Sequence, residues 1–100
     1  MVVVFRNRLR ADAPPKDYFE LGERMYELAS QMPGFIATKD FVAPDGERLT
    51  IIEFETAEQV AAWGAHAEHR AAQQSGRDVY YEEYSLQVCE QRRESRWQRP

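Results

Sequence analysis

A polar residue, Asn7, interrupts an apolar row in the first strand-like segment of the chain. Val3, Phe5 and Leu9 share its parity, and arginines fill the alternate positions that follow Phe5. Residues two apart lie on the same face of a strand, so Asn7 falls on the apolar side. A buried amide costs free energy unless it finds a hydrogen-bond partner. Asn7 is therefore expected either to be paired near the end of the strand or to line a binding pocket.

A second set of candidate residues follows Trp63 along a predicted helix. Each helical residue turns by about 100°, which places His66, Arg70 and Gln73 within about 80° of Trp63 on one side. His69 points elsewhere if that helix is unbroken. An aromatic wall beside a few polar groups is typical of small-molecule sites. The spacing predicts a pocket between this helix and the sheet, to which the amide of the first strand contributes a polar contact.

The same residues also allow purely structural interpretations. Tryptophan is more often a core residue than a site residue, and Arg70 and Gln73 are ordinary residues of a helix surface. His66 and His69 have the spacing of a metal pair, but no third ligand is evident, so no metal site is predicted. The chain has no glycine-rich phosphate loop, no catalytic serine triad and no flavin or nicotinamide fingerprint.

The composition indicates one domain of 100 residues with a net charge of −4, which gives no reason to expect a nucleic-acid partner. The single cysteine, Cys89, excludes an internal disulfide. No signal peptide or long apolar run is evident, so we expect a cytoplasmic protein with no membrane partner. The arginine-rich tail at residues 92–100 is separated from the domain at 1–91, and we expect it to be solvated or to dock on a partner.

Periodicity predicts elements in the order β-α-β-β-α-β. Pro33 and Gly34 end the first helix, and Thr56 with Gln59 forms a capping box that begins the second. This order is typical of an α+β, ferredoxin-like fold, a four-stranded antiparallel sheet with both helices on one face. The predicted ranges are strand 2–10, helix 15–31, strands 35–43 and 48–55, a helix from about 57 to 75 with a break near 66–68, a short helical turn near 79–80, and strand 84–90.

The two middle strands are apolar on both faces. Phe41 and Val42 have opposite parity, as do Ile51 and Ile52. Two helices cover only one face of such a sheet, and strands that are apolar on both sides need cover on both. The simplest second cover is another copy of the chain, so we predict a homodimer packed sheet to sheet.

Several short motifs, in this order and spacing, resemble the antibiotic biosynthesis monooxygenase (ABM) family over roughly residues 2–90. The family resemblance implies a ferredoxin-like fold whose two sheets join into a dimeric α/β barrel. The family includes enzymes that oxygenate anthrones and similar aromatics with O₂ and no metal or flavin, and also heme-degrading monooxygenases. The motifs are Asn7-Arg8-Leu9, Met32-Pro33-Gly34-Phe35, Ile52-Glu53-Phe54-Glu55, and Ala62-Trp63 followed by His66-Ala-Glu-His69-Arg70.

The heme-degrading branch implies a more detailed pattern. It has an asparagine on the first strand, a tryptophan on the second long helix, and a heme-ligating histidine ten residues after that tryptophan. Asn7 and Trp63 match the first two, but the third position is Gln73. A glutamine amide is a poor iron ligand compared with imidazole. The departure argues against ordinary heme degradation, unless His66 or His69 substitutes at a different height in the pocket.

Three functions follow as hypotheses. The first is a cofactor-independent monooxygenase that acts with O₂ on a phenol, hydroquinone or anthrone. In it, Trp63 walls the substrate, Asn7 stabilises a developing oxyanion or peroxide, and His66 accepts the proton. The second is heme binding or degradation, and the third is a non-enzymatic dimeric protein that binds a small molecule. The predicted catalytic residues are Asn7, Trp63 and His66, and the predicted substrate-binding residues are Arg70, Gln73 and His69.

Overall fold

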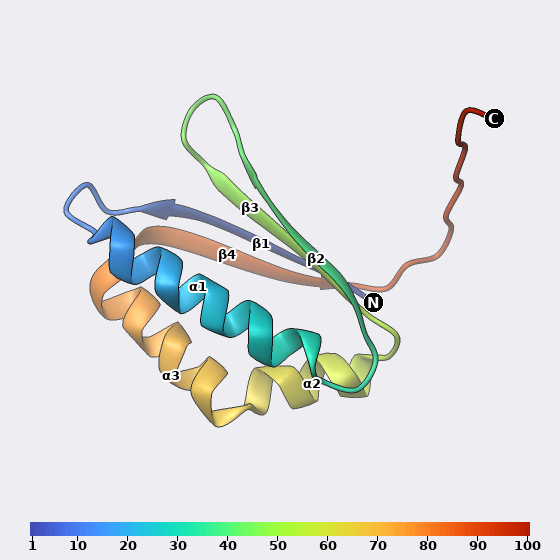
Figure 1. The fold of residues 1–100 in the computed structure, drawn as a ribbon, viewed down its shortest axis with the longest axis horizontal. Coiled ribbons are helices and arrows are strands. Elements are labelled where there is room, and N and C mark those ends of the chain that lie inside the picture. The colour runs from blue at the N-terminus through green and yellow to red at the C-terminus, as the bar shows by residue number, and fades with distance from the viewer.

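The computed structural model describes residues 1–100 as one four-stranded antiparallel sheet with helices on one side (Figure 1). The strand order is β2-β3-β1-β4, so the first and last strands pair although they are far apart in sequence. This arrangement confirms the predicted α+β, ferredoxin-like fold. The elements are β1 (Val2–Leu9), α1 (Pro15–Ser30), β2 (Phe35–Val42), β3 (Arg48–Phe54), α2 (Ala57–Ala65), α3 (Ala67–Ser75), the π-helical turn η1 (Gly76–Tyr80) and β4 (Tyr81–Cys89).

The junction from α1 to β2 is fixed by a glycine that contacts the next helix. Gly34 has a φ of 80°, and a Cβ there would clash with the Gln59 side-chain oxygen. Gln59 belongs to the predicted capping box, which is present: the Gln59 N–H donates to the Thr56 hydroxyl at 3.2 Å, and Gln59 Oε1 accepts from the Thr56 N–H at 3.0 Å. The glycine therefore lets the start of β2 pack directly on the start of α2.

The second helical segment is broken at His66, as the sequence predicted. His66 has φ −61° and ψ 130°, an extended conformation that ends α2 and begins α3. Its ring Nδ1 accepts from the Glu68 N–H at 3.2 Å, which caps α3. The break lets α3 turn independently of α2, so spacing measured along an unbroken helix no longer says which side chains face the sheet.

The last strand begins three residues earlier than predicted. Strand β4 starts at Tyr81, and its pairing with β1 shifts between Arg8 and Leu9, where Glu83 and Tyr81 are the respective partners. Such a bulge inserts one residue into a strand. It removes the alternation over 81–84 on which strand prediction depends.

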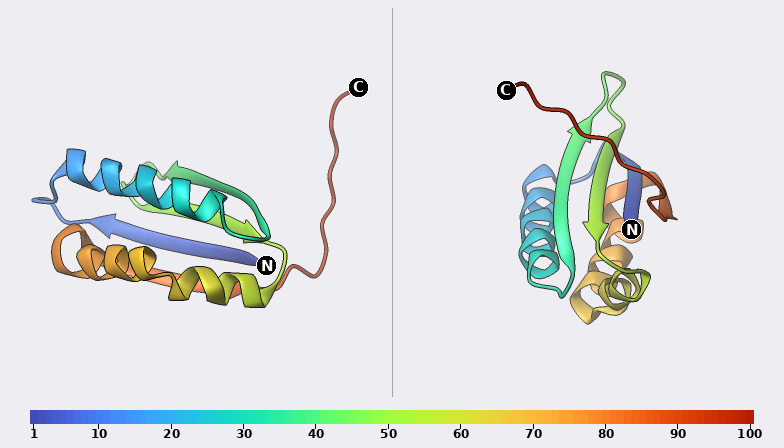
Figure 2. Two further views of the ribbon diagram at one scale, coloured as in Figure 1. Left: turned by 60° about the horizontal axis from the view of Figure 1, so that its bottom comes forward. Right: turned by 90° about the vertical axis from the view of Figure 1, so that its right-hand side faces the viewer.

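The helices flank the sheet unevenly. Figure 2 shows α1 on one flank and α2 with α3 on the other, with β1 visible between them. The core cluster lies toward the beginning of β1 and contains Ala29, Phe54 and Trp63. None of the helices has the length and apolar composition that a membrane span requires. Residues 90–100 form no helix or strand and extend away from the sheet (Figure 1).

Candidate functional site

Asn7 is the most deeply buried polar residue of the chain. It lies on β1, with Arg48 of β3 and Tyr84 of β4 as its cross-strand neighbours. The residue is 2 % exposed, and its amide oxygen Oδ1 has no hydrogen-bond partner. An unpaired buried oxygen costs roughly 1–3 kcal/mol, so such atoms are rare without a function. The structure therefore does not contain the hydrogen bond near the strand end that was one of the two roles expected for the Asn7 side-chain oxygen.

A group of aromatic residues lies close to Asn7, whose cross-strand neighbour Tyr84 belongs to it. The Phe5 ring lies 5.6 Å from Tyr81 and 5.7 Å from Tyr84, and Tyr81 lies 6.1 Å from Tyr18 of α1. Burial, and then the neighbouring Tyr18 hydroxyl, raises the pKa of Tyr81 far above its ordinary value, so its phenol stays protonated. Sequence reasoning missed these tyrosines, because the bulge concealed that Tyr81 shares a face with Phe5.

Trp63 lies in the core, where it is 5 % exposed and packs with Ala29 and Phe54. One face of its indole is covered by His69, whose ring is stacked on it at 4.2 Å with an interplanar angle of 17°. The His66 ring is farther away, at 5.7 Å. Trp63 therefore supports the His69 ring by stacking and does not present this face of its indole to a pocket. A ligand on this side would contact the imidazole and not the indole.

The two histidines use their ring nitrogens in opposite ways. His66 Nδ1 accepts a hydrogen bond from a backbone N–H, so the lone pair of that nitrogen is occupied. His69 Nδ1 lies 3.0 Å from the Trp63 carbonyl oxygen. A carbonyl only accepts, so this nitrogen carries the proton and Nε2 keeps a free lone pair. Burial lowers the pKa of His69, more than the Trp63 carbonyl raises it, and the ring is therefore neutral at pH 7. A neutral ring with a free Nε2 is the form a general base requires.

The remaining predicted site residues differ in how exposed they are to solvent. Arg70 is exposed on α3, whereas Gln73 and His69 are partly buried on the side of α3 that faces inward. The expected grouping of His66, Arg70 and Gln73 beside Trp63 assumed a continuous helix, and the break at His66 changes the orientation of α3 residues relative to Trp63. No group of three or more His, Cys, Asp or Glu side chains in the structure has the spacing that a metal ion needs.

Solved structures with the same fold include several monooxygenases. An antibiotic biosynthesis monooxygenase matches with a TM-score of 0.77 and 15 % identity, over 91 % of this chain and 98 % of that one. Rv0793 from Mycobacterium tuberculosis matches with a TM-score of 0.82 and 14 % identity, over 95 % and 97 %. SnoaB, a cofactor-independent oxygenase from Streptomyces nogalater, matches with a TM-score of 0.66 and 17 % identity, over 90 % and 94 %. The chain thus has the fold of the antibiotic biosynthesis monooxygenases, which confirms the resemblance at the level of the fold.

One curated relative is closer in sequence. The uncharacterized protein YqjZ of Bacillus subtilis (strain 168) is 36 % identical over 72 residues, a match that covers 72 % of this chain and 63 % of YqjZ. The matched segment thus spans a little less than two thirds of that relative. No family model matches the chain.

Proposed function

We propose that the protein is a cofactor-independent monooxygenase that acts with O₂ on an electron-rich aromatic of the phenol, hydroquinone or anthrone type. The observation that carries the proposal is the unpartnered amide oxygen of Asn7, a residue that is only 2 % exposed and has Tyr84 as a cross-strand neighbour. Such an oxygen can accept a hydrogen bond from a hydroxyl group of the ligand. The shared fold with SnoaB, a cofactor-independent oxygenase, supports the same reaction class.

His69 takes the role of proton acceptor in this proposal, in place of the predicted His66. Its Nε2 is free and its Nδ1 proton is held by the Trp63 carbonyl, whereas His66 already uses a ring nitrogen to cap α3. Trp63 then acts as a positioning residue, because it supports the His69 ring by stacking and by its carbonyl. Gln73 supplies a partly buried polar contact on the same helix.

The chemistry balances without an added cofactor. His69 removes a proton from the bound phenol or anthrone, and the resulting anion passes one electron to O₂ to give a radical pair. The radical pair combines at a ring carbon to form a hydroperoxide, and the O–O bond of this hydroperoxide then breaks. One oxygen atom stays on the ring as a carbonyl, the other leaves as water, and both hydrogens of that water come from the substrate. A side-chain N–H of Asn7 donates to the oxygen that gains negative charge.

Oxygen uptake tests the proposal with 1,8-dihydroxyanthrone in buffer treated with EDTA, after subtraction of the spontaneous rate. We expect enzyme-dependent uptake that falls at least roughly 100-fold in His69→Gln, the range lost with a general base. Asn7→Ala should lose a similar factor, and the tail variant Arg93→Gln should retain full activity. Uptake that is unchanged in both site variants would refute the assignment. Inactivity of the folded wild type across a panel of anthrones and quinols would favour a non-enzymatic binding protein.

Heme fits this site poorly. The resemblance requires a heme-ligating histidine at position 73, where this chain has Gln73. The histidine nearest to that position in the sequence is His69, and its ring is stacked on Trp63. Titration with hemin checks this conclusion. We expect no Soret shift at micromolar hemin, and a shift that disappears in His69→Ala would instead establish heme binding through that residue.

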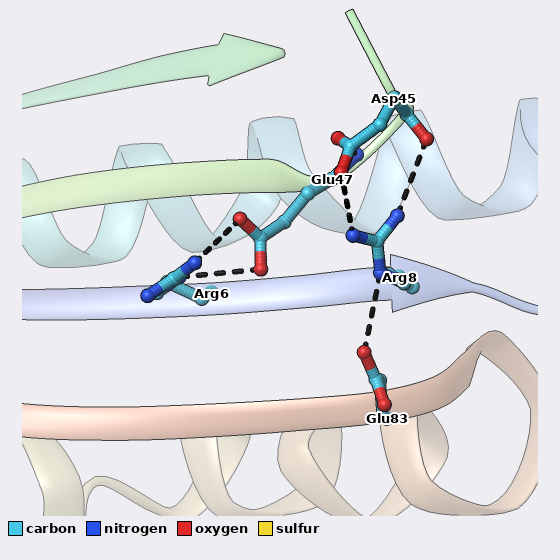
Figure 3. A network of polar contacts seen from close by, with 5 residues as sticks. All are labelled: Arg6, Arg8, Asp45, Glu47 and Glu83. Carbon is cyan, nitrogen blue, oxygen red and sulfur yellow. Dashed lines mark hydrogen bonds and ion pairs between the residues drawn. The ribbon is translucent and has the colours of Figure 1, made fainter. Parts of the chain in front are cut away.

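We also propose that two copies pack sheet to sheet through the face without helices. Val4, Phe41 and Leu49 lie on this face and line a hollow of about 350 Å³. At the end of the same face, Arg6 pairs with Glu47 at 2.8 Å, and Arg8 pairs with Asp45 and Glu83 at 2.8 and 3.2 Å (Figure 3). Phe41→Glu should convert a dimer into a monomer in analytical ultracentrifugation, and a wild type that sediments as a monomer would contradict the proposal.

A further inference from the structure

Arg48 is a cation on the helix side of the sheet without an anionic partner. The partly buried arginines of the chain are Arg8, Arg10 and Arg48. Arg8 pairs with Asp45 and Arg10 pairs with Asp12, but no carboxylate lies at ion-pair distance from Arg48. Charged groups that leave water are normally paired. The missing counter-ion makes Arg48 the unsatisfied member of this set.

Aromatic rings hold the Arg48 guanidinium but do not satisfy it. Its central carbon lies 5.5 Å from the Tyr18 ring and 5.4 Å from the Phe19 ring. These cation–π contacts fix the side chain against α1. Its five N–H groups still need oxygen acceptors, and none of the hydrogen bonds of the structure involves them. The carboxylate on this face of β2, Asp40, instead accepts from the Thr50 hydroxyl at 2.6 Å.

The unsatisfied cation lies beside the unsatisfied amide. Arg48 and Asn7 are direct cross-strand partners in the β1–β3 ladder, and paired residues place their side chains on the same face about 5 Å apart at Cβ. One position therefore combines a free guanidinium with a buried free amide oxygen. The guanidinium can donate hydrogen bonds to an anion, and the amide oxygen can accept one from a hydroxyl group. A single ligand that carries both an anionic group and a hydroxyl group would therefore partner both residues.

We propose that Arg48 binds a carboxylate on the ligand whose hydroxyl group is held by Asn7, so that the protein selects hydroxylated aromatic acids over their neutral analogues. A planar guanidinium matches a carboxylate with two parallel hydrogen bonds. The inference rests on the proposed function only in taking the ligand to be a hydroxylated aromatic. It adds an acidic group to that ligand and assigns a specificity role to Arg48.

A matched pair of probes tests the selectivity without turnover. The pair is 6-hydroxy-2-naphthoate and 2-naphthol, which differ in the carboxylate and keep the hydroxyl, and binding is measured by isothermal titration calorimetry. We expect the acid to bind at least roughly tenfold more tightly to the wild type, as charge-assisted hydrogen bonds provide. Arg48→Gln should remove this preference by weakening only the acid, and Arg48→Lys should retain part of it.

Arg93→Gln removes the same charge from the exposed tail and should leave the preference intact. Circular dichroism and thermal melting verify that each variant is folded. Equal affinity of the wild type for both probes would overturn the proposal, as would a preference that survives Arg48→Gln or no binding of either probe at millimolar concentration. Because binding is measured without oxygen uptake, selectivity that is present in an inactive protein would refute the monooxygenase proposal alone.

Discussion

The two ends of the helix-covered side of the sheet differ in how their buried groups are satisfied. At the end near the start of β1, Phe54 is completely buried and packs with Trp63 and Ala29. At the other end, Asn7 is buried almost as deeply but leaves an oxygen without a partner, and Arg48 beside it lacks a counter-ion. Proteins tend to depart from such packing rules at functional sites. The contrast indicates that Phe54 and Ala29 serve stability, whereas Asn7 and Arg48 keep groups that can contact a ligand.

The largest expected effect is at the apolar end. Phe54→Ala removes a side chain that is 0 % exposed and leaves a cavity between β3, α1 and α2. Truncating a fully buried phenylalanine typically costs about 3–5 kcal/mol in the free energy of unfolding. Urea denaturation followed by circular dichroism measures the loss.

Phe41→Ala is the matched control on the opposite face of the sheet. Its side chain is 44 % exposed, so the loss at low protein concentration should be within about 1 kcal/mol. Equal losses for Phe54→Ala and Phe41→Ala would show that the core extends through the sheet and not only toward the helices.

A smaller effect of opposite sign is expected at the polar end. Asn7→Leu replaces the unpaired amide with an apolar side chain of similar size among Phe5, Tyr81 and Tyr84. Removing an unsatisfied buried group should raise the free energy of unfolding by about 1–2 kcal/mol. The same variant should be inactive in oxygen uptake, so stability and activity change in opposite directions.

The control for this prediction is Asn7→Asp, which keeps the shape but introduces a charge at the same buried position. It should lower the stability, because an ionised carboxylate loses its hydration there. If Asn7→Leu were instead destabilising, Asn7 would be a paired structural residue, and the polar end would then resemble the apolar end.

Much of the fold could be predicted from local patterns. The capping box at Thr56, the glycine at position 34 and the alternation in β1 each depend on a few neighbouring residues, and all appear in the structure. The start of β4 was wrong by three residues, because the bulge opposite Arg8 and Leu9 depends on pairing with a strand more than 70 residues away in the sequence.

The candidate site was less predictable than the fold. Asn7 could be selected from its strand parity alone, and its burial agrees with that selection. Arg48 and Tyr81 could not, because only the register of the sheet brings them to Asn7. The choice between His66 and His69 depends on a single backbone angle at residue 66 and on which backbone group each ring nitrogen meets. These facts are tertiary, and residue spacing does not encode them.

The smallest expected effect concerns His69 of α3, whose ring is stacked on Trp63. Burial lowers its folded-state pKa below the ordinary 6.5. As the pH falls below about 6.5, the unfolded chain therefore gains a proton first, and the free energy of unfolding decreases until the folded-state pKa is reached. Above that window both states are neutral and the stability is complete. Urea denaturation at intervals between pH 7.5 and 5 should show this decline, and His69→Gln should abolish it.

The control is Gln73→Ala, a change at the next partly buried polar residue of α3, which should preserve the dependence of stability on pH. An identical slope in His69→Gln would mean that the imidazole is hydrated in solution, and the neutral base required by the proposed reaction would then lose its support.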